Sequence, residues 1–312
     1  MKTNFYSLLS RLSLFCVSFI PILAQAQTEQ DAIMMGQRKF CVAGSVGYNS
    51  WTNYWEGTFK RDNENLGRVS TKSAMLMVNY GIRSNLNFMA SLPYIKTEAT
   101  KGTLSGLDGF QDAGVFVKWL PWQKQFGHQT VSLFAVGGYS TPSNKYNIDF
   151  LPLCVGLGSQ VLSGRLIADV RVSNFTLTVS GAYLHRSNVE IDRPAYYTDH
   201  QINSHEVKMP DAGNFQLRTG YRSRLLIAEA FVDNMTTFGG FDIRKNDMPF
   251  VSNQMNSTKV GIEGKHYLAK LPAFGFHANA WRTLAGRNVG QATGFMAGVD
   301  YIFDFSPKTA KN

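Results

Sequence analysis

The sequence predicts an all-β fold, a transmembrane antiparallel β-barrel of about twelve strands. The main observation is a series of segments of roughly ten residues in which apolar and polar side chains alternate, as in strands with one face in lipid. Beyond the leader no run of about 18 apolar residues occurs, so a transmembrane helix is not expected. Aromatic residues make up 13% of the chain and only 17% of residues are charged, whereas soluble domains carry about 25% charged residues. A periplasmic β-sandwich is the alternative that this composition leaves open.

The first 26 residues have the layout of a cleaved secretory signal peptide. Lys2 and Arg11 are its only charged residues, an apolar run spans 12–23, and the small residues of Ala24-Gln25-Ala26 suit a signal peptidase. The apolar run is shorter than the roughly 20 residues that a membrane-spanning helix needs. A lipoprotein signal would use Cys16, but the large side chains before it do not fit a lipobox. Export together with the strand pattern predicts the outer membrane of a Gram-negative bacterium.

The last predicted strand illustrates the alternation. Phe295, Val299 and Tyr301 fall on one face, which suits lipid. Asp300 and Asp304 fall on the other face, which suits a wet interior. A helix would need apolar residues at every third or fourth position, and these segments do not show that spacing. The predicted strands are 40–54, 66–82, 85–98, 110–120, 129–141, 150–172, 174–187, 207–222, 224–238, 252–268, 273–283 and 291–305.

The connections between these segments alternate between short turns and mostly longer loops, as in barrels with periplasmic turns and long outer loops. With both termini periplasmic, the chain divides into a signal peptide at 1–26, a short periplasmic N-terminal segment or small plug at 27–39, the β-barrel at 40–305 and a periplasmic tail at 306–312. The segment 27–39 is too short for the plug domain of an energised transporter, which favours a passive function.

Charge and export together define the expected partners. The net charge of +9 becomes +7 once the two leader cations are removed. An exported protein does not ordinarily meet nucleic acid, so no nucleic-acid partner is expected. We expect a small hydrophobic ligand, outer-membrane lipid and lipopolysaccharide, and the barrel-assembly machinery as partners. No cofactor is expected.

The same alternation selects the residues whose side chains should point into the barrel and line the lumen. Charged residues alternate there with methionine and phenylalanine, and methionine adapts to ligands of varied shape. Such a lumen suits binding sites for an apolar ligand. Simple filling of the interior stays open, because eight strands give a filled barrel and sixteen a water channel. The candidate lumen-lining and ligand residues are Met75, Met77, Met89, Asp112, Phe116, Lys118, Asp169, Arg171, Arg186, Arg218, Arg222, Glu229, Phe231, Asp233, Glu263, Lys265, Met296, Asp300 and Asp304.

Two prolines mark a candidate lateral opening in the wall. Pro93 and Pro152 fall in the outer parts of the third and sixth predicted strands, where a proline removes a donor from the ladder. Barrels use such defects, often with bulges, to bend a strand. A gap there would let a hydrophobic ligand leave the lumen sideways into lipid. The alternative is that both prolines end regular pairing at a loop boundary.

Catalytic signatures are missing, so an enzyme is not expected. GxSxG, HExxH, CxxC and P-loop motifs do not occur. His185 and Ser187 both fall on the lipid-facing side of their strand near the outer rim, where a lipid hydrolase would need them. Two positions apart on a strand they are about 6–7 Å apart, and no acid follows on that face. His200 and His205 are poorly spaced in a loop for a metal site.

One part of the chain is similar to a known family. A strand ending in a Tyr-Gly turn, followed by a strand ending in Leu-Pro-Tyr, resembles the outer-membrane proteins of the meta-cleavage pathway of phenol degradation, relatives of the FadL-type channels. The family's Gly-Asp at the next strand is matched at 108–112, with Gln111 in place of its second glycine. The segments 31–35 and 51–57 resemble members from Bacteroidetes. The residues that carry the match are Val78-Asn79-Tyr80-Gly81-Ile82-Arg83-Ser84-Asn85-Leu86-Asn87-Phe88 and Ser91-Leu92-Pro93-Tyr94.

The resemblance covers about 74–120 and implies uptake of hydrophobic or aromatic small molecules across the outer membrane. We therefore expect a passive, porin-like channel or binding barrel for such molecules. A structural or interaction barrel, which adheres through its outer loops or binds a partner at its rim, is the second hypothesis. An outer-membrane lipid-modifying enzyme is the third.

Overall fold

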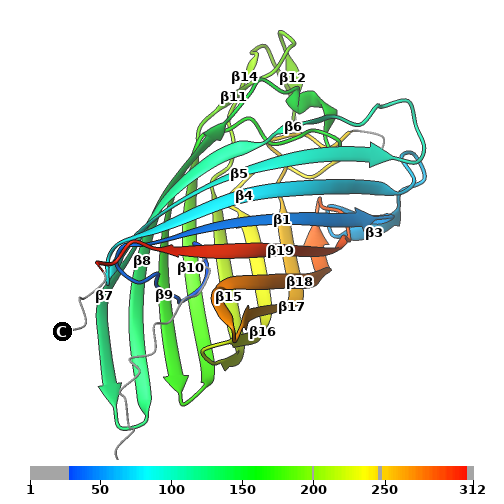
Figure 1. Cartoon of the computed structure of the whole chain (residues 1–312). Coiled ribbons are helices and arrows are strands. Elements are labelled where there is room, and N and C mark those ends of the chain that lie inside the picture. The colour runs from blue at the N-terminus through cyan, green and yellow to red at the C-terminus, as the bar shows by residue number, and fades with distance from the viewer. Residues whose placement is uncertain (1–27, 199, 245–247, 308–312) are drawn as a thin grey trace, which may run out of the picture.

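The computed structural model describes residues 28–198, 200–244 and 248–307, and the expected signal peptide at 1–26 lies outside them. Twelve antiparallel strands form one closed barrel (Figure 1), which confirms the predicted fold class. The barrel closes where β1 pairs with β19, from Lys39↔Asp304 to Ser50↔Thr293. The barrel strands are β1 (Lys39–Trp51), β4 (Val69–Arg83), β5 (Leu86–Ala99), β7 (Asp112–Phe126), β8 (Gln129–Pro142), β9 (Val161–Val172), β10 (Phe175–Arg186), β15 (Ala212–Arg222), β16 (Leu226–Thr237), β17 (Asn256–Leu268), β18 (Leu271–Arg287) and β19 (Thr293–Asp304).

Shorter elements lie between the barrel strands. β6 extends the sheet beside β5, while the other short strands form small pairs of their own. Among the described residues, no helix is long and apolar enough to cross a membrane. The short elements are β2 (Asn53–Glu56), β3 (Phe59–Asp62), β6 (Asp108–Phe110), β11 (Val189–Glu190), β12 (Tyr196–Tyr197), β13 (Gln201–Ile202), β14 (Glu206–Val207) and the 3-10 helix η1 (Ile148–Phe150).

Side chains alternate between the outer surface and the interior as predicted. In β19, Phe295 and Val299 are exposed on the outside, whereas Asp300 is buried. Each of the twelve barrel strands carries at least one large exposed apolar side chain. The outer surface is therefore apolar and the interior holds the polar groups, which is the arrangement of a barrel surrounded by lipid.

The two ends of the barrel differ in their connections. The short-turn end carries the turns 84–85, 127–128, 173–174, 223–225 and 269–270, together with the start of β1 and the end of β19. The opposite end, here called the loop end, carries the connections 52–68, 100–111, 143–160, 187–211, 238–255 and 288–292. Short and mostly longer connections alternate as the sequence predicts.

The sixth barrel strand begins later than predicted. The pattern predicts a strand from residue 150, but β9 starts at Val161. Pro152 lies after η1 in the 143–160 loop, where Leu153 is fully buried. The predicted place of Pro152 in the sixth strand was therefore wrong, and a proline in this loop cannot interrupt the hydrogen-bond ladder of the wall.

The fourth barrel strand runs further than predicted. The sequence predicts an end near residue 120, yet β7 continues to Phe126. A register shift between Trp119 and Trp122 places Pro121 in a bulge, where its missing N–H costs no ladder bond. β7 and β8 therefore extend as a long hairpin at the short-turn end (Figure 1).

Pro93 does lie in the wall, where β5 changes partner. β5 pairs with β7 up to Ser91 and with β6 from Tyr94 onward, and the register differs by one residue across the change. The Pro93 carbonyl accepts a hydrogen bond from the Gln111 N–H (2.9 Å). A residue with an N–H at position 93 would return a bond to the Gln111 carbonyl, but Ser143 Oγ donates to that carbonyl instead (2.6 Å). Pro93 therefore removes one ladder bond at an irregular point of the wall.

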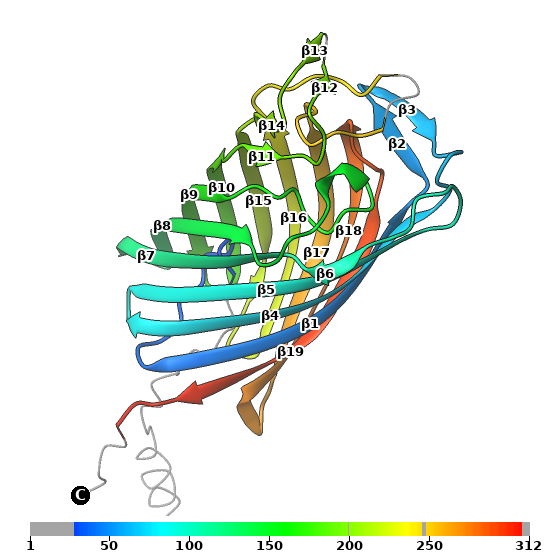
Figure 2. The same ribbon diagram turned by 90° about the horizontal axis from the view of Figure 1, so that it is seen from above.

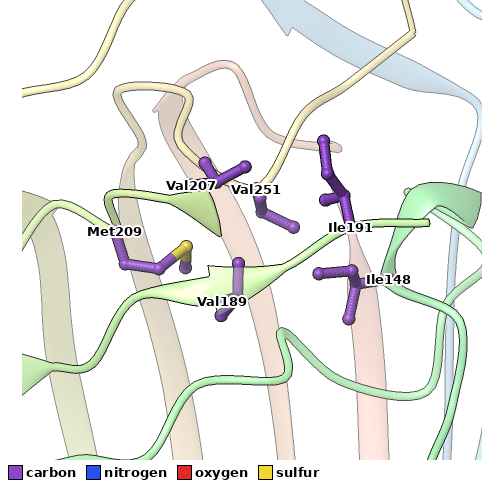
Figure 3. Packing of buried hydrophobic residues seen from close by; sticks show 6 residues of the cluster. All are labelled: Ile148, Val189, Ile191, Val207, Met209 and Val251. Carbon is purple, nitrogen blue, oxygen red and sulfur yellow. The ribbon is translucent and has the colours of Figure 1, made fainter. Parts of the chain in front are cut away.

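Three long loops pack together at the loop end and are called the loop cap (Figure 2). Their apolar cluster joins the 143–160, 187–211 and 238–255 connections (Figure 3). The 143–160 loop is also bound to the last residues of β5, because Thr97 Oγ1 donates to the Leu153 carbonyl (2.6 Å). The buried members of the cluster are Ile148, Val189, Ile191, Val207, Met209 and Val251.

Candidate functional site

The N-terminal segment, residues 28–38, enters the barrel at the short-turn end and lies against the inner wall. Lys118 of β7 holds it, since Nζ donates to the backbone carbonyls of Thr28 (2.5 Å) and Asp31 (2.8 Å). Nζ also pairs with the Asp31 carboxylate at 3.0 Å, and both side chains are shielded from solvent. Further along the segment, Ala32 and Met34 pack against an apolar cluster on β8 and β9.

A connected network of ion pairs continues from the N-terminal segment across β17, β16 and β15 to β9. It contains four cations and four carboxylates, so the buried charges balance. Balance matters because an unpaired buried charge is strongly unfavourable. The links are Lys118–Asp31 (3.0 Å), Asp31–Lys265 (3.7 Å), Lys265–Glu263 (3.3 Å), Glu263–Arg218 (3.1 Å), Arg218–Glu229 (3.1 Å), Glu229–Arg222, and Arg222–Asp169 (3.1 Å).

Asp31 keeps its charge in this setting. Burial by itself would raise the pKa of the Asp31 carboxyl, but Lys118 and Lys265 together outweigh burial. The pKa of Asp31 therefore lies well below its usual range. Asp31 with Lys118 and Lys265 is called the Asp31 latch below.

A cavity of about 650 Å³ occupies the lumen on the loop side of the N-terminal segment and is called the lumen cavity. Its volume is within the range of roughly 300–1,000 Å³ that small-molecule sites occupy. Part of its wall is apolar, built by methionines of β4 and β19 and by aromatic side chains. The apolar lining residues are Met75, Met77, Phe116, Val136, Val161, Ala182, Leu184, Phe231, Met235, Trp281 and Met296.

The remaining wall of the lumen cavity is polar and includes two cations outside the ion-pair network. Arg165 donates to Ser180 Oγ (2.9 Å) and Asn214 Oδ1 (2.7 Å). Lys259 Nζ lies 4.8 Å from the centre of the Trp281 ring. Within the described part of the chain, neither cation forms an ion pair. The cavity thus combines flexible apolar surface with polar groups that could orient a ligand.

A second cavity of about 500 Å³ lies at the short-turn end. Residues 32–34 line it together with turn residues such as Ser84 and His128, whereas residues 28–30 line the lumen cavity. The N-terminal segment therefore lies between the two cavities.

The structure brings most of the predicted lumen residues together. The lumen cavity is lined by Met75, Met77, Phe116, Arg218, Phe231, Asp233, Glu263 and Met296. The second cavity is lined by Asp169, Arg171 and Arg222. Lys118, Glu229 and Lys265 belong to the network, Met89 is buried, and Asp300 lies 3.3 Å from His277. Their role as ligand contacts stays a prediction.

Three predicted residues lie away from the cavities, at the ends of their strands. Asp112 accepts a hydrogen bond from Tyr146 in the loop cap. Arg186 ends β10 at the loop end. Asp304 pairs with Lys39 at the short-turn end (3.7 Å). Two lumen residues, Arg165 and Lys259, were not among the predicted ones, although the alternation along their strands places both side chains inward. No role was predicted for Asp31.

His185 has an acidic partner near the loop end. Asp211, which precedes β15, lies 3.2 Å from His185 Nδ1, and the Tyr183 hydroxyl donates to it. The hydrogen bond from Tyr183 helps to lower the pKa of Asp211 to about 2. The expectation that no acid follows on that face concerned the strand of His185 itself, whereas Asp211 comes from the end of the 187–211 connection, just before β15. Ser187 Oγ accepts from the Gln160 N–H (2.9 Å) and does not contact His185.

No family model matches the sequence, and no curated protein matches it. Among solved structures, the NanC porin gives a TM-score of 0.46 at 10% identity, covering 83% of this chain and 98% of its own. The COG4313 outer membrane channel from Pseudomonas putida F1 gives a TM-score of 0.69 at 11% identity, covering 90% of this chain and 100% of its own. At this identity the likeness concerns the fold, and the chain shares the barrel fold of that outer-membrane channel.

Proposed function

We propose that this protein is an outer-membrane barrel that binds or passes small hydrophobic or aromatic molecules without energy coupling. The observation that carries the proposal is the lumen cavity, in which Met75, Met77 and Met296 form a flexible apolar wall. The family resemblance in 74–120 supports the same class of cargo. In this proposal the short-turn end faces the periplasm, the loop cap faces outward, and the N-terminal segment is a small plug.

Uptake into liposomes tests this function. Liposomes that contain the folded protein should accumulate labelled aromatic compounds or fatty acids faster than empty liposomes, and faster than a polar solute of similar size. Met77→Gln keeps the side-chain length but makes the apolar wall polar, so apolar uptake should fall by roughly tenfold. Met255→Gln is the matched control, because Met255 is a half-buried methionine that lines neither the lumen cavity nor the cavity at the short-turn end. Equal rates for apolar and polar solutes would indicate a general porin, and no uptake at all would favour a structural barrel.

A lateral exit near Pro93 is a further part of the proposal. Valine at position 93 supplies the missing N–H, which would bond to the Gln111 carbonyl and regularise the wall. Pro93→Val should therefore slow the flux of an apolar aromatic compound several-fold while leaving a polar solute unchanged. Pro121→Val is the matched control, since Pro121 occupies a bulge at the short-turn end. Equal effects on both solutes, or none, would leave Pro93 as an interruption of the ladder without a role in transport.

A further inference from the structure

The loop cap contains its own cavity, of about 590 Å³, called the cap pocket. It lies between the 187–211 and 238–255 connections, with Asp149 of η1 at its border. None of its lining residues lines the lumen cavity or the cavity at the short-turn end. The cap pocket is therefore a separate site on the loop side of the barrel.

The aromatic walls of the cap pocket are held by the buried cluster of the loop cap. Tyr196 and Phe250 line the pocket and pack against that cluster, whose members are shown in Figure 3. Their ring centroids are 5.5 Å apart, and Phe241 adds a third ring 6.3 Å from Phe250. The Asn253 side chain fixes Phe250 and Phe241, since it accepts from the Phe250 N–H (2.6 Å) and donates to the Phe241 carbonyl (3.1 Å). The aromatic surface is thus formed before any ligand arrives, which lowers the entropic cost of binding.

Two arginines stand over aromatic rings of the same pocket. The Arg193 guanidinium lies 5.4 Å from the Phe250 centroid and pairs with Asp149 at 2.7 Å. The Arg244 guanidinium lies 4.3 Å from the Tyr197 centroid and is exposed. Within the described residues, Arg244 has no carboxylate partner and no hydrogen bond to its guanidinium. A guanidinium stacked on a ring keeps its N–H edge free, and that edge matches a carboxylate with two parallel hydrogen bonds.

We propose that the cap pocket binds a small aromatic carboxylate. The ring of the ligand packs against Phe241 and Tyr197, and its carboxylate accepts hydrogen bonds from Arg244. The described lining residues include two arginines and one acid, Asp149, so the pocket favours an anion over a neutral compound. The flat rings favour an aromatic anion over an inorganic one. This inference goes beyond the proposed function, because binding in the loop cap does not require passage through the lumen.

Calorimetric titration of the purified full-length protein in detergent tests the cap pocket, with benzoate, benzyl alcohol, acetate and inorganic phosphate as probes. Benzoate should bind to one site and at least about tenfold more tightly than the other three. Arg244→Gln should weaken benzoate binding by about tenfold or more, since a charge-assisted bidentate contact is lost. Arg61→Gln is the matched control. Arg61 also stacks on a ring, Phe59 (5.0 Å), but already pairs with Glu56 (2.7 Å).

Two further variants make the result decisive. Tyr197→Leu removes the ring beneath Arg244 without changing charge, and it should also weaken benzoate binding. Arg165→Gln changes the lumen cavity alone and should leave benzoate binding unchanged. The inference is overturned if benzoate does not bind, if phosphate or acetate binds as tightly, or if Arg244→Gln binds benzoate like the wild type. Loss of binding in Arg165→Gln with retention in Arg244→Gln would also overturn it, because the ligand would then occupy the lumen. Liposome uptake does not enter this test, so failure of the proposed transport function would leave it intact.

Discussion

Replacing Lys118 by methionine is expected to release the N-terminal segment from the lumen and to open a path through the barrel. The substitution keeps an unbranched side chain out to the ε position but removes the ammonium that bonds to Thr28 and Asp31. Removing one partner of a buried ion pair costs about 3–5 kcal/mol, which corresponds to a shift of roughly a hundredfold or more in the docking equilibrium. Since the segment separates two cavities, single-channel conductance in planar bilayers should rise by about an order of magnitude.

Lys39→Met is the matched control for this experiment. It removes the same charge from a lysine that pairs with Asp304 at the short-turn end, outside the latch. Its conductance should stay at the wild-type level. A Lys118→Met barrel that folds but conducts like the wild type would show that the loop cap, and not the N-terminal segment, closes the lumen.

The Asp31 latch also sets a pH range for docking of the segment. The pKa of Asp31 in the docked state lies well below its value in a free segment, which is about 3.9. Docking therefore has its full strength above that free value and weakens as the pH falls below it. At neutral and mildly acidic pH the latch is expected to stay closed.

The barrel strands were predictable because their signal is local. Alternation along one strand depends only on whether successive side chains face lipid or the interior, and β19 shows this over its whole length. The same rule failed before β9, because Leu153 is buried against Leu66 and Val69 at the loop end, and the apolar residues around it have the composition of a strand. At β7 the pattern predicted an end near residue 120, but a bulge between Trp119 and Trp122 accommodates Pro121 and the strand continues beyond it.

For the candidate site, the direction of the side chains could be predicted from the sequence, but the contacts between them could not. The alternation along a strand tells which way a side chain points, and it assigned Met75 and Arg218 to the inward face, where they line the lumen cavity. It does not tell which groups meet there, because partners come from distant parts of the chain. Lys118 and Asp31 are 87 positions apart, and His185 meets Asp211 from the connection that precedes β15. The cap pocket draws on three loops, for which no periodicity exists, so only the folded structure could reveal it.

Deletion of residues 299–305 is expected to abolish assembly of the barrel. These residues form the end of β19 that pairs with β1, from Val299↔Gly44 to Asp304↔Lys39, and with β18, from Val299↔Phe276 to Tyr301↔Phe274. Without them β1 and β18 both present unpaired backbone groups to lipid, where each costs several kcal/mol. The deletion also removes outward aromatic side chains, among them Tyr301, Phe303 and Phe305. The heat-modifiable band that marks a folded barrel in gel electrophoresis should be lost from outer-membrane fractions.

Deletion of 306–312 is the control for this experiment, because the barrel strands end at Asp304. The shortened chain should keep the heat-modifiable band and its yield in the outer membrane. The double substitution Phe303→Ala and Phe305→Ala separates aromatic recognition from closure, since it keeps every backbone bond of β19. If the assembly machinery requires the terminal aromatic residues, this variant should assemble poorly although its ladder is complete. If closure alone matters, it should assemble normally while the chain lacking 299–305 does not. A heat-modifiable band from the chain without 299–305 would show that neither requirement holds.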